Sequence, residues 1–477
     1  MISLSNSAVV GVIGAGTMGA GIAQVAAAAG HPVKLFDTKA GAAEAGRQRM
    51  IGGLRKLVAK GRMTTASVDD LIGRVQICDT LEELAGSELV IEAIVEDLEV
   101  KRNLFGQIED ILGEEAILAT NTSSISVTAI AARLRRPERC AGLHFFNPAP
   151  VMKLVEVVSG LATSPVVART LLATAEAWGK VAVPARSTPG FIVNRVARPF
   201  YAEALRLYEE QVANPATIDA LMTESGGFRM GPFALMDLIG NDVNYAVSQS
   251  VFAAFYQEPR FRPSIVQLEM VDAGWLGQKS GRGFYDYAEA APRPAAPSLP
   301  VREGVELFDS AVAGGIPVME SGVLFALTDG RTAALRARAE GTPVVLHDLV
   351  LDMHRAARIG FCASPDVPDA VIERFVATAA AAGKAGTRLP DWPGLVVMRT
   401  VAMLANEAFE AVLHGVSQEA GIDAAMKHGL NYPLGPAEWA RMIGLAHVVG
   451  VIDALFAATH DPRYRVSYGL RRAADPA

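Results

Sequence analysis

Short apolar runs alternate with longer segments of helical periodicity from Ala8 to about Ala185. Six of these runs have the length and composition of buried strands: VVGVIG from Val9, PVKLFD from Pro32, LVIEAI from Leu89, AILATN from Ala116, RCAGLHFF from Arg139 and KVAVPA from Lys180. Repeated strand, crossover helix and strand units are typical of a doubly wound, mainly parallel sheet. We therefore predict an α/β domain over residues 1–187.

Beyond Thr188 the pattern changes to long helical stretches such as GFIVNRVARPFYAEALRLYEEQV. This texture predicts an all-helical domain over residues 188–287. A stretch rich in Ala and Pro, residues 288–300, reads as a semi-rigid linker. Residues 40–74 form a basic insertion with helical spacing after the second strand, and we expect it to be a helical excursion from the sheet.

The helical domain occurs twice. Pro189-Gly190 reappears 204 residues later as Pro393-Gly394, and a register without gaps holds over some fifty residues. The same offset relates Val193 to Val397, Arg195 to Arg399, Glu203-Ala204 to Glu407-Ala408, Ile218-Asp219-Ala220 to Ile422-Asp423-Ala424, Gly231-Pro232 to Gly435-Pro436, and Ile239-Gly240 to Ile443-Gly444. We therefore predict a second helical copy over residues 390–477, preceded by a shrunken α/β segment over residues 301–389.

Composition excludes several classes of protein. The net charge of −7 gives no global attraction to nucleic acid or to an anionic membrane surface. No apolar run reaches about 18 residues, so we expect no membrane partner. Cys78, Cys140 and Cys362 are widely spaced and form no CxxC pair, so we expect reduced, buried thiols, no metal and a cytoplasmic protein.

A glycine-rich turn follows the first strand. Gly14-x-Gly16-x-x-Gly19 joins it to an Ala-rich helix, with Thr17 and Met18 inside the turn. Gly14 permits the tight turn, Gly16 admits a pyrophosphate to the backbone, and Gly19 allows close packing of helix on strand. Asp37 ends the second strand, where a carboxylate accepts hydrogen bonds from ribose hydroxyls and repels a 2′-phosphate. The pattern predicts a Rossmann domain that binds NAD, although the nearby Lys39 leaves some NADP tolerance open.

Oxidation of an alcohol with NAD needs a base, and histidine has a suitable pKa. His144 ends a strand at the carboxyl edge, where doubly wound sheets bind ligands. Glu156 lies in an otherwise apolar strand, MKLVEVV, where a carboxylate needs a partner. Ser123, at another strand end, and Asn194, near the first long helix, complete the candidate set. Each also has a structural explanation: a core histidine, a strand-edge charge, a helix cap and a helix-start polar residue.

Six blocks resemble, in order and spacing, those of the L-3-hydroxyacyl-CoA dehydrogenase family: GAGTMGAGIAQVAA, IEAIVEDLEVKRNLF, NTSSISVTAIA, GLHFFNPAPVMKLVEVV, TPGFIVNR and KSGRGFYDY. The resemblance covers residues 8–287. It implies that His144 is the base, that Glu156 orients it, and that Ser123 and Asn194 bind the substrate oxygen. It further implies NAD contacts from the glycine turn and from Asp37, Glu96, Lys101, Ser123 and Lys279.

The resemblance also implies a CoA substrate. Family members bind CoA partly on the helical excursion, where LRKLVAKGR places Arg55, Lys56 and Lys60; a solvated basic helix face is the alternative for Arg55 and Lys56. Lys60 matches a family contact, whereas Gly53 replaces the family serine. The duplicated layout resembles the long members associated with phenylacetate degradation, which oxidise 3-hydroxyadipyl-CoA. Arg198, one turn after Asn194, is then a candidate partner for the distal carboxylate, or simply an exposed helical arginine. 3-Hydroxybutyryl-CoA is the alternative substrate.

The second copy lacks the predicted catalytic residues. Met398 stands at the offset of Asn194, and a longer extension of the register puts Asp348 at the place of His144 and Gly360 at that of Glu156. Shorter family members dimerise through the helical domain, so we expect the silent copy to replace a partner subunit, with further homo-oligomerisation left open. Two other classes of protein fit the sequence less well. β-Hydroxyacid dehydrogenases lack the HFFNP block, and a purely structural NAD-binding protein would not require all four polar positions.

Overall fold

The computed structural model describes residues 3–289, 291–292, 294–308 and 317–475, which divide into two compact units. Unit 1 contains residues 1–195 together with 415–430, and unit 2 contains 196–414 and 431–477. Residues 290 and 293 of the predicted linker and 309–316 of the predicted α/β segment lie outside the described residues, as do the chain ends 1–2 and 476–477.

Unit 1 is built on an eight-stranded sheet of order β3-β2-β1-β4-β5-β6-β7-β8. All neighbours are parallel except β6 and β7. The strands are β1 (Val10–Ile13), β2 (Val33–Phe36), β3 (Val75–Cys78), β4 (Leu89–Glu92), β5 (Ile117–Thr120), β6 (Cys140–Phe145), β7 (Leu154–Ser159) and β8 (Val181–Arg186). The predicted doubly wound, mainly parallel sheet is confirmed.

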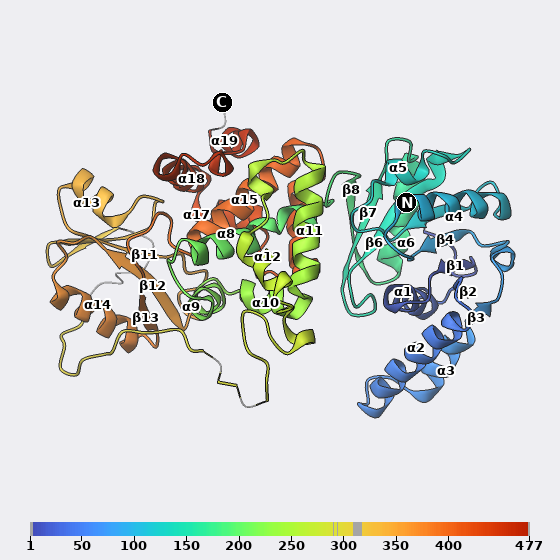
Figure 1. The fold of residues 1–477 in the computed structure, drawn as a ribbon, viewed down its shortest axis with the longest axis horizontal. Helices are drawn as coiled ribbons and strands as arrows, with labels where there is room; N and C mark the ends of the chain where they lie inside the picture. The colour runs from blue at the N-terminus through green and yellow to red at the C-terminus, as the bar shows by residue number, and fades with distance from the viewer. Residues whose placement is uncertain (1–2, 290, 293, 309–316, 476–477) are drawn as a thin grey trace. The chain divides into compact units, whose positions relative to one another are not determined.

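The crossover helices of unit 1 bury apolar faces against this sheet. They are α1 (Thr17–Ala28), α4 (Leu98–Ile111), α5 (Val127–Ala131) and α6 (Pro165–Ala177), with short turns η1 (Glu82–Leu84) and η2 (Pro137–Arg139). The basic insertion forms two helices, α2 (Ala42–Ala59) and α3 (Thr65–Gly73), which extend from the β2–β3 side of the sheet (Figure 1). Strand β3 was not predicted from the sequence, because its four residues, VQIC, are too few to show a period and include a polar glutamine.

Unit 2 holds most of the two helical copies. The first copy gives α8 (Arg198–Glu209), α9 (Pro215–Ala220), η3 (Leu221–Ser225), α10 (Pro232–Ile239), α11 (Asn241–Ala254), η4 (Pro259–Phe261), α12 (Ile265–Asp272) and η5 (Gln278–Ser280); the short α7 (Val193–Val196) precedes them at the boundary between the units. The second gives α15 (Val397–Leu413), α17 (Pro436–Ile443), α18 (Leu445–Thr459), η6 (Pro462–Tyr464) and α19 (Tyr468–Ala474). The predicted duplication of the helical fold is thus present.

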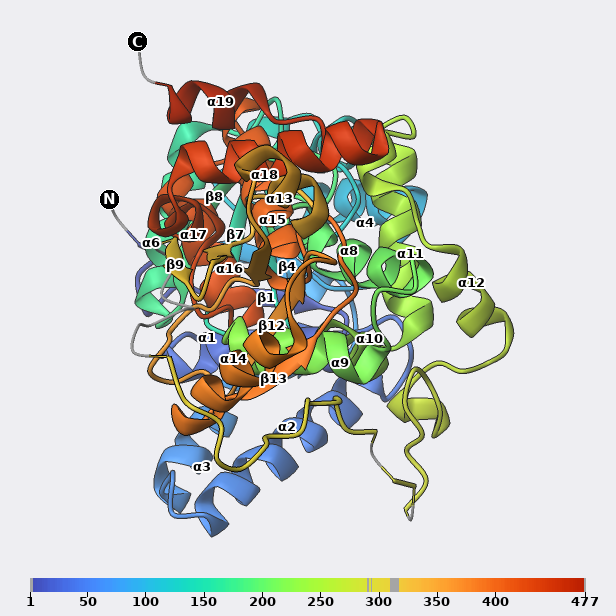
Figure 2. The same ribbon diagram turned by 90° about the vertical axis from the view of Figure 1, so that its left-hand side faces the viewer.

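A second, five-stranded sheet of order β13-β12-β11-β10-β9 also belongs to unit 2. Its strands are β9 (Val318–Glu320), β10 (Val323–Leu327), β11 (Val344–His347), β12 (Arg358–Ala363) and β13 (Ala385–Arg388). Helices α13 (Ala333–Glu340) and α14 (Asp369–Ala381) accompany them, and Figure 2 shows α14 beside β13. This small α/β layer precedes the second helical copy as the large sheet precedes the first.

The small sheet repeats the pairing of the large one. In unit 1, antiparallel β6 and β7 place His144 opposite Glu156. In unit 2, β11 and β12 are likewise antiparallel, and the backbone N–H of Asp348 donates to the carbonyl of Gly360. The buried Asp348 carboxylate accepts hydrogen bonds from the backbone N–H groups of Val396, Val397 and Met398 (2.8–3.0 Å). The second copy therefore keeps a carboxylate that anchors the start of its helix, while it has lost the imidazole.

The two copies exchange one helix. Helix α16 (Glu419–Leu430) belongs to the second copy by sequence but lies in unit 1, packed on β7 and β8. The carbonyl of Val416 accepts from the N–H of Arg186, on the edge strand β8. Conversely, η3 of the first copy packs on β12, where Ser225 Oγ donates to the carbonyl of Arg358 (2.8 Å). Each sheet thus receives its neighbouring helix from the other copy.

Buried ion pairs also join the copies inside unit 2. Glu203 on α8 accepts from Arg399 Nε on α15 (2.9 Å), from Arg206 Nη1 (2.5 Å) and from the Tyr464 hydroxyl (2.9 Å). Glu203 is 0% exposed and Arg399 is 1% exposed. Burial opposes ionisation of Glu203, but the charges of Arg206 and Arg399 outweigh it and lower the pKa of this carboxyl below its ordinary value of 4.5.

Glu203→Gln is expected to lower the free energy of unfolding by about 3–5 kcal/mol, because it removes the buried charge that Arg206 and Arg399 share and leaves Arg399 with Glu210 alone. Since the folded pKa lies below the unfolded one, the contribution of Glu203 is complete above about pH 4.5 and is lost as the pH falls further. Urea unfolding as a function of pH measures both effects. The exposed pair Asp453–Arg471 supplies the control: Asp453→Asn should change stability by less than about 1 kcal/mol, and equal losses would contradict the prediction.

All three cysteines are buried free thiols. Among the described helices, none is by itself long and apolar enough to cross a membrane. Helices α17 and α18, which are bent by 97° relative to each other, reach that length and apolar composition only when taken together.

Candidate active site

The glycine turn after β1 has the geometry that its sequence predicts. Gly14 has φ +96°, and a Cβ there would lie 2.4 Å from the carbonyl oxygen of Ala93. A Cβ on Gly19 would lie 1.7 Å from the carbonyl oxygen of Gly14, because helix and strand are in close contact. A Cβ on Gly16, in contrast, would have no atom of the described residues within 4 Å other than those of its chain neighbours. The turn is tightly packed at Gly14 and Gly19, where strand and helix meet. It leaves space at Gly16, the residue that a pyrophosphate would approach.

The N-terminus of α1 adds unpaired N–H groups to this open side. Thr17 and Met18 are the first two residues of the helix, and Gly16 precedes them with no side-chain cap. A helix N-terminus presents backbone donors and a positive dipole end to phosphates. Asp37, directly after β2, accepts from the N–H of Ala15 (2.7 Å) and of Lys39 (2.9 Å). Its carboxylate therefore braces the glycine turn at the place predicted for the ribose.

Gly16→Val is expected to leave the fold intact and to weaken NAD binding by at least tenfold, because the added side chain occupies the open space beside the turn. Isothermal titration with NAD and a thermal melt measure the two properties. Gly19→Ala is the matched comparison: its methyl group would meet the Gly14 carbonyl, so this variant should lose stability as well. Unchanged NAD affinity in Gly16→Val would rule out this binding position.

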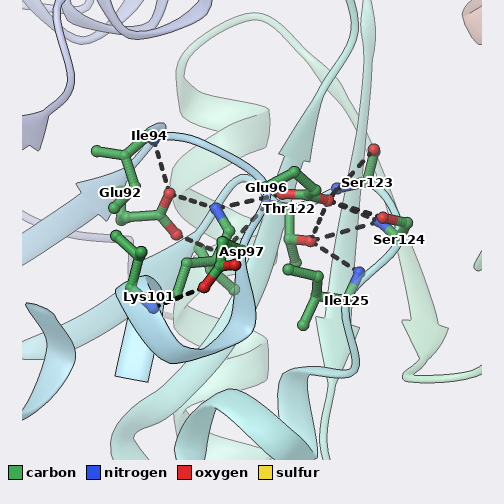
Figure 3. Close-up of polar contacts among 11 residues, drawn as sticks. Glu92, Ile94, Glu96, Asp97, Lys101, Thr122, Ser123, Ser124 and Ile125 are labelled. Carbon is green, nitrogen blue, oxygen red and sulfur yellow. Dashed lines mark hydrogen bonds and ion pairs between the residues drawn. The ribbon is translucent and has the colours of Figure 1, made fainter. Parts of the chain in front are cut away.

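Glu96 is a hub of hydrogen bonds between two strand ends (Figure 3). Its carboxylate accepts from Thr122 Oγ1 (2.6 Å), Ser124 Oγ (2.9 Å) and the N–H of Ser123 (3.0 Å), and lies 3.3 Å from Lys101 Nζ. Burial opposes ionisation, but these donors outweigh it and lower the pKa of Glu96. The network fixes the loop that carries Ser123 relative to the loop after β4.

A second carboxylate, Glu92, shares Lys101 with Glu96 and was not identified from the sequence. It is 0% exposed at the end of β4 and accepts from Lys101 Nζ (2.5 Å), Thr120 Oγ1 (2.7 Å) and the N–H of Ile94 (2.7 Å). Lys101 itself is 1% exposed. The signal was available, because Glu92 interrupts the apolar run LVIEAI in the way that Glu156 interrupts MKLVEVV.

His144 and Glu156 form the central pair of the site. They lie opposite each other on β6 and β7, and His144 Nδ1 is 2.6 Å from Glu156 Oε2. The other oxygen of Glu156 accepts from the N–H groups of Ile192 (3.2 Å) and Val193 (2.9 Å). If Glu156 is the acceptor and the imidazole is neutral, the hydrogen lies on Nδ1 and Nε2 presents a lone pair. The His144 ring is 6% exposed and packs against Phe146 and Phe191 (ring centroids 4.5 and 5.8 Å apart).

The other two candidate catalytic residues are also brought together. Asn194 Nδ2 donates to the backbone carbonyl of Ser123 (3.4 Å), and Ser123 Oγ lies 3.5 Å from Glu96. Asn194 directly follows Val193, whose N–H is bound by Glu156. The four polar positions are thus linked through the backbone around residues 192–194, within unit 1.

The remaining predicted contacts lie elsewhere. Arg55, Lys56 and Lys60 are exposed on or directly after α2. Lys279 lies in unit 2, where its Nζ pairs with Asp242 (2.6 Å). Arg198 also lies in unit 2 and is only 7% exposed. The alternative of an exposed helical arginine is therefore wrong for Arg198, because the helices around it enclose its side chain.

Sequence profiles of three domains match the chain. The 3-hydroxyacyl-CoA dehydrogenase NAD-binding domain matches residues 9–188. The 3-hydroxyacyl-CoA dehydrogenase C-terminal domain matches twice, at residues 190–287 and 394–475. The 3-hydroxybutyryl-CoA dehydrogenase reduced Rossmann-fold domain matches residues 325–393.

Known relatives match the chain at two lengths. The 3-hydroxyadipyl-CoA dehydrogenase of Escherichia coli K12 is 45% identical and aligns over 98% of both chains. A probable 3-hydroxybutyryl-CoA dehydrogenase of Bacillus subtilis is 45% identical over 58% of this chain and 96% of its own length. Among solved structures, a 3-hydroxybutyryl-CoA dehydrogenase from E. coli K12 has a TM-score of 0.93 at 44% identity, with 98% of both chains covered. The (S)-3-hydroxybutyryl-CoA dehydrogenase of Ralstonia eutropha has a TM-score of 0.57 at 39% identity, covering 59% of this chain and 99% of its own.

Proposed function

The chain belongs to the 3-hydroxyacyl-CoA dehydrogenase family, and from this we propose that it oxidises a (3S)-3-hydroxyacyl-CoA to the 3-oxoacyl-CoA with His144 as the general base. The observation that carries the proposal is the 2.6 Å contact between His144 Nδ1 and Glu156. This contact supports a neutral imidazole with its hydrogen on Nδ1, in which Nε2 is free to accept a proton.

Each of these residues of unit 1 has its own role in the proposed reaction. Nε2 of His144 takes the proton of the 3-hydroxyl group, and Glu156 stabilises the imidazolium that results. Ser123 and Asn194 hold the substrate oxygen. The glycine turn, Asp37, Glu96 and Lys101 would hold NAD, which would supply the acceptor for the hydride from C3. In the reverse direction, His144 returns the proton and the same oxygen contacts polarise the 3-oxo group.

We propose 3-hydroxyadipyl-CoA as the substrate, because a relative that aligns over 98% of both chains carries that activity in its name. 3-Hydroxybutyryl-CoA is the alternative, since structures similar to this chain are named for it. On the excursion, the cations of Arg55, Lys56 and Lys60 suit the phosphates of CoA.

A panel of 3-hydroxyacyl-CoA thioesters, followed by NADH absorbance, tests the function and ranks the substrates. Higher kcat/KM for 3-hydroxyadipyl-CoA than for 3-hydroxybutyryl-CoA is the expected result. The reverse order would favour the alternative substrate. NAD binding without turnover of any thioester would favour a non-catalytic, structural protein. We also propose a cytoplasmic location, in keeping with three free buried thiols.

A further inference from the structure

Arg198, the first residue of α8, is a buried cation without a carboxylate partner. Its side chain is 93% buried (7% exposed), yet no Asp or Glu among the described residues forms an ion pair with it. Other buried arginines of unit 2 are matched: Arg206 and Arg399 contact Glu203, and Arg260 contacts Glu407 (2.9 Å). A buried charge is costly unless it is paired, so the exception calls for a ligand.

The contacts that Arg198 does make satisfy only part of its guanidinium group. Nη1 donates to Ser248 Oγ on α11 (3.2 Å), and the group lies 5.0 Å from the centre of the Tyr201 ring. Nε is buried and has no acceptor. Burial lowers the pKa of Arg198, and only Tyr201 and Tyr432 oppose this effect. An arginine has five N–H donors in a planar fork that matches a carboxylate.

The side chain lines a cavity of about 210 Å³ that lies wholly within unit 2. Tyr201, Ser248 and Gln267 supply polar groups, while its apolar wall consists of Ala202, Leu205, Phe261, Pro263 and Ile265. Glu209 also lines the cavity, but its carboxylate is exposed and accepts a hydrogen bond from Ser264 Oγ (2.5 Å). A cation and a hydroxyl group beside an apolar wall fit a carboxylate attached to methylene groups.

We propose that this cavity, called here the Arg198 cavity, binds an aliphatic carboxylate through Arg198 and Ser248. The carboxylate has two candidate sources. The first, which rests on the proposed function, is the distal carboxylate of a 3-hydroxydicarboxylyl-CoA substrate. Arg198 follows Asn194, the proposed oxygen contact, by four residues, so their Cα atoms lie at most roughly 14 Å apart. The second source is a free dicarboxylate that occupies the Arg198 cavity as a separate ligand.

Arg198→Ala in the full chain tests whether Arg198 binds the distal carboxylate of the substrate. We expect kcat/KM for 3-hydroxyadipyl-CoA to fall about 10- to 100-fold, the effect of a lost charge-assisted hydrogen bond. The value for 3-hydroxybutyryl-CoA, which has no distal carboxylate, should change less than about threefold. Ser248→Ala should give a smaller loss of the same selectivity without removing the charge. Arg229→Ala is the matched control, because Arg229 is an exposed arginine outside the Arg198 cavity.

Adipate tests whether the Arg198 cavity binds a free dicarboxylate. If the Arg198 cavity takes a free dicarboxylate, millimolar adipate should raise the melting temperature of the wild type but not of Arg198→Gln, with the substrate preference unchanged. Arg198→Gln also serves the kinetic test if Arg198→Ala does not fold. Equal losses with both thioesters, together with no effect of adipate, would overturn the proposal. Activity on 3-hydroxybutyryl-CoA in that case would leave the dehydrogenase function intact, whereas no turnover of any thioester by the wild type would refute the function itself.

Discussion

His144→Ala is expected to lower kcat for 3-hydroxyacyl-CoA oxidation roughly 10²- to 10⁴-fold, the usual contribution of a positioned general base. NAD affinity should stay unchanged, because the imidazole touches neither the glycine turn nor the Glu96 hub among the described contacts. Removal of the ring also leaves Glu156 bound to two backbone N–H groups, so the fold should persist. Steady-state rates of NADH formation and a titration with NAD measure the two quantities.

Two further variants separate the base from its support. Glu156→Gln keeps an oxygen for the N–H groups of Ile192 and Val193 but removes the charge that stabilises the imidazolium, so it should also be strongly impaired. His354→Ala, a change of an exposed histidine, should retain wild-type rates. If His144→Ala kept kcat within about tenfold of the wild type, another group would have to act as the base.

Patterns among neighbouring residues predicted most strands of unit 1 and the pairing of its buried carboxylate. Apolar runs located seven of the eight strands of unit 1, and the lone carboxylate in MKLVEVV pointed to a paired Glu156. The constant offset also carried His144 to Asp348 and Glu156 to Gly360, and the backbone hydrogen bond between Asp348 and Gly360 confirms that equivalence. This register is readable because the same residues recur at one constant offset without gaps.

Features that depend on segments far apart in the chain were not predictable. Nothing in residues 415–430 indicates that they leave their own copy and cover β7 and β8, because the packing face of α16 is apolar in either place. The enclosure of Arg198 depends in the same way on α11 and α12, some fifty residues beyond it. Strand β3 was missed for a local reason, since VQIC is too short to show a period.

In the second copy, the carboxylate that anchors the helix start lies on the other strand of the antiparallel pair. Asp348 occupies the strand position of His144, yet its carboxylate performs the anchoring that Glu156 performs in unit 1, reaching the helix start from the opposite strand. Gly360 has no side chain to occupy that space. The second copy therefore has the contact that positions the helix start, without an imidazole at the place of His144.

A chain that ends at Tyr287 is expected to dimerise or aggregate. It would lack α16, which covers β7 and β8 in unit 1. In unit 2 it would lack Tyr432 and Trp439, which pack against Phe200 and Phe228. Exposed apolar faces of this kind drive association.

Two truncated chains can cover these faces by exchanging helices. Ile218-Asp219-Ala220 corresponds to Ile422-Asp423-Ala424 of α16, so each chain can offer its own α9 and η3 to the β7–β8 edge of the other. Sedimentation velocity should then show a dimer or larger species, and residues 288–477 supplied as a separate polypeptide should reduce them. A stable monomer with wild-type activity would contradict the prediction, because it would mean that neither sheet needs a helix from a second copy.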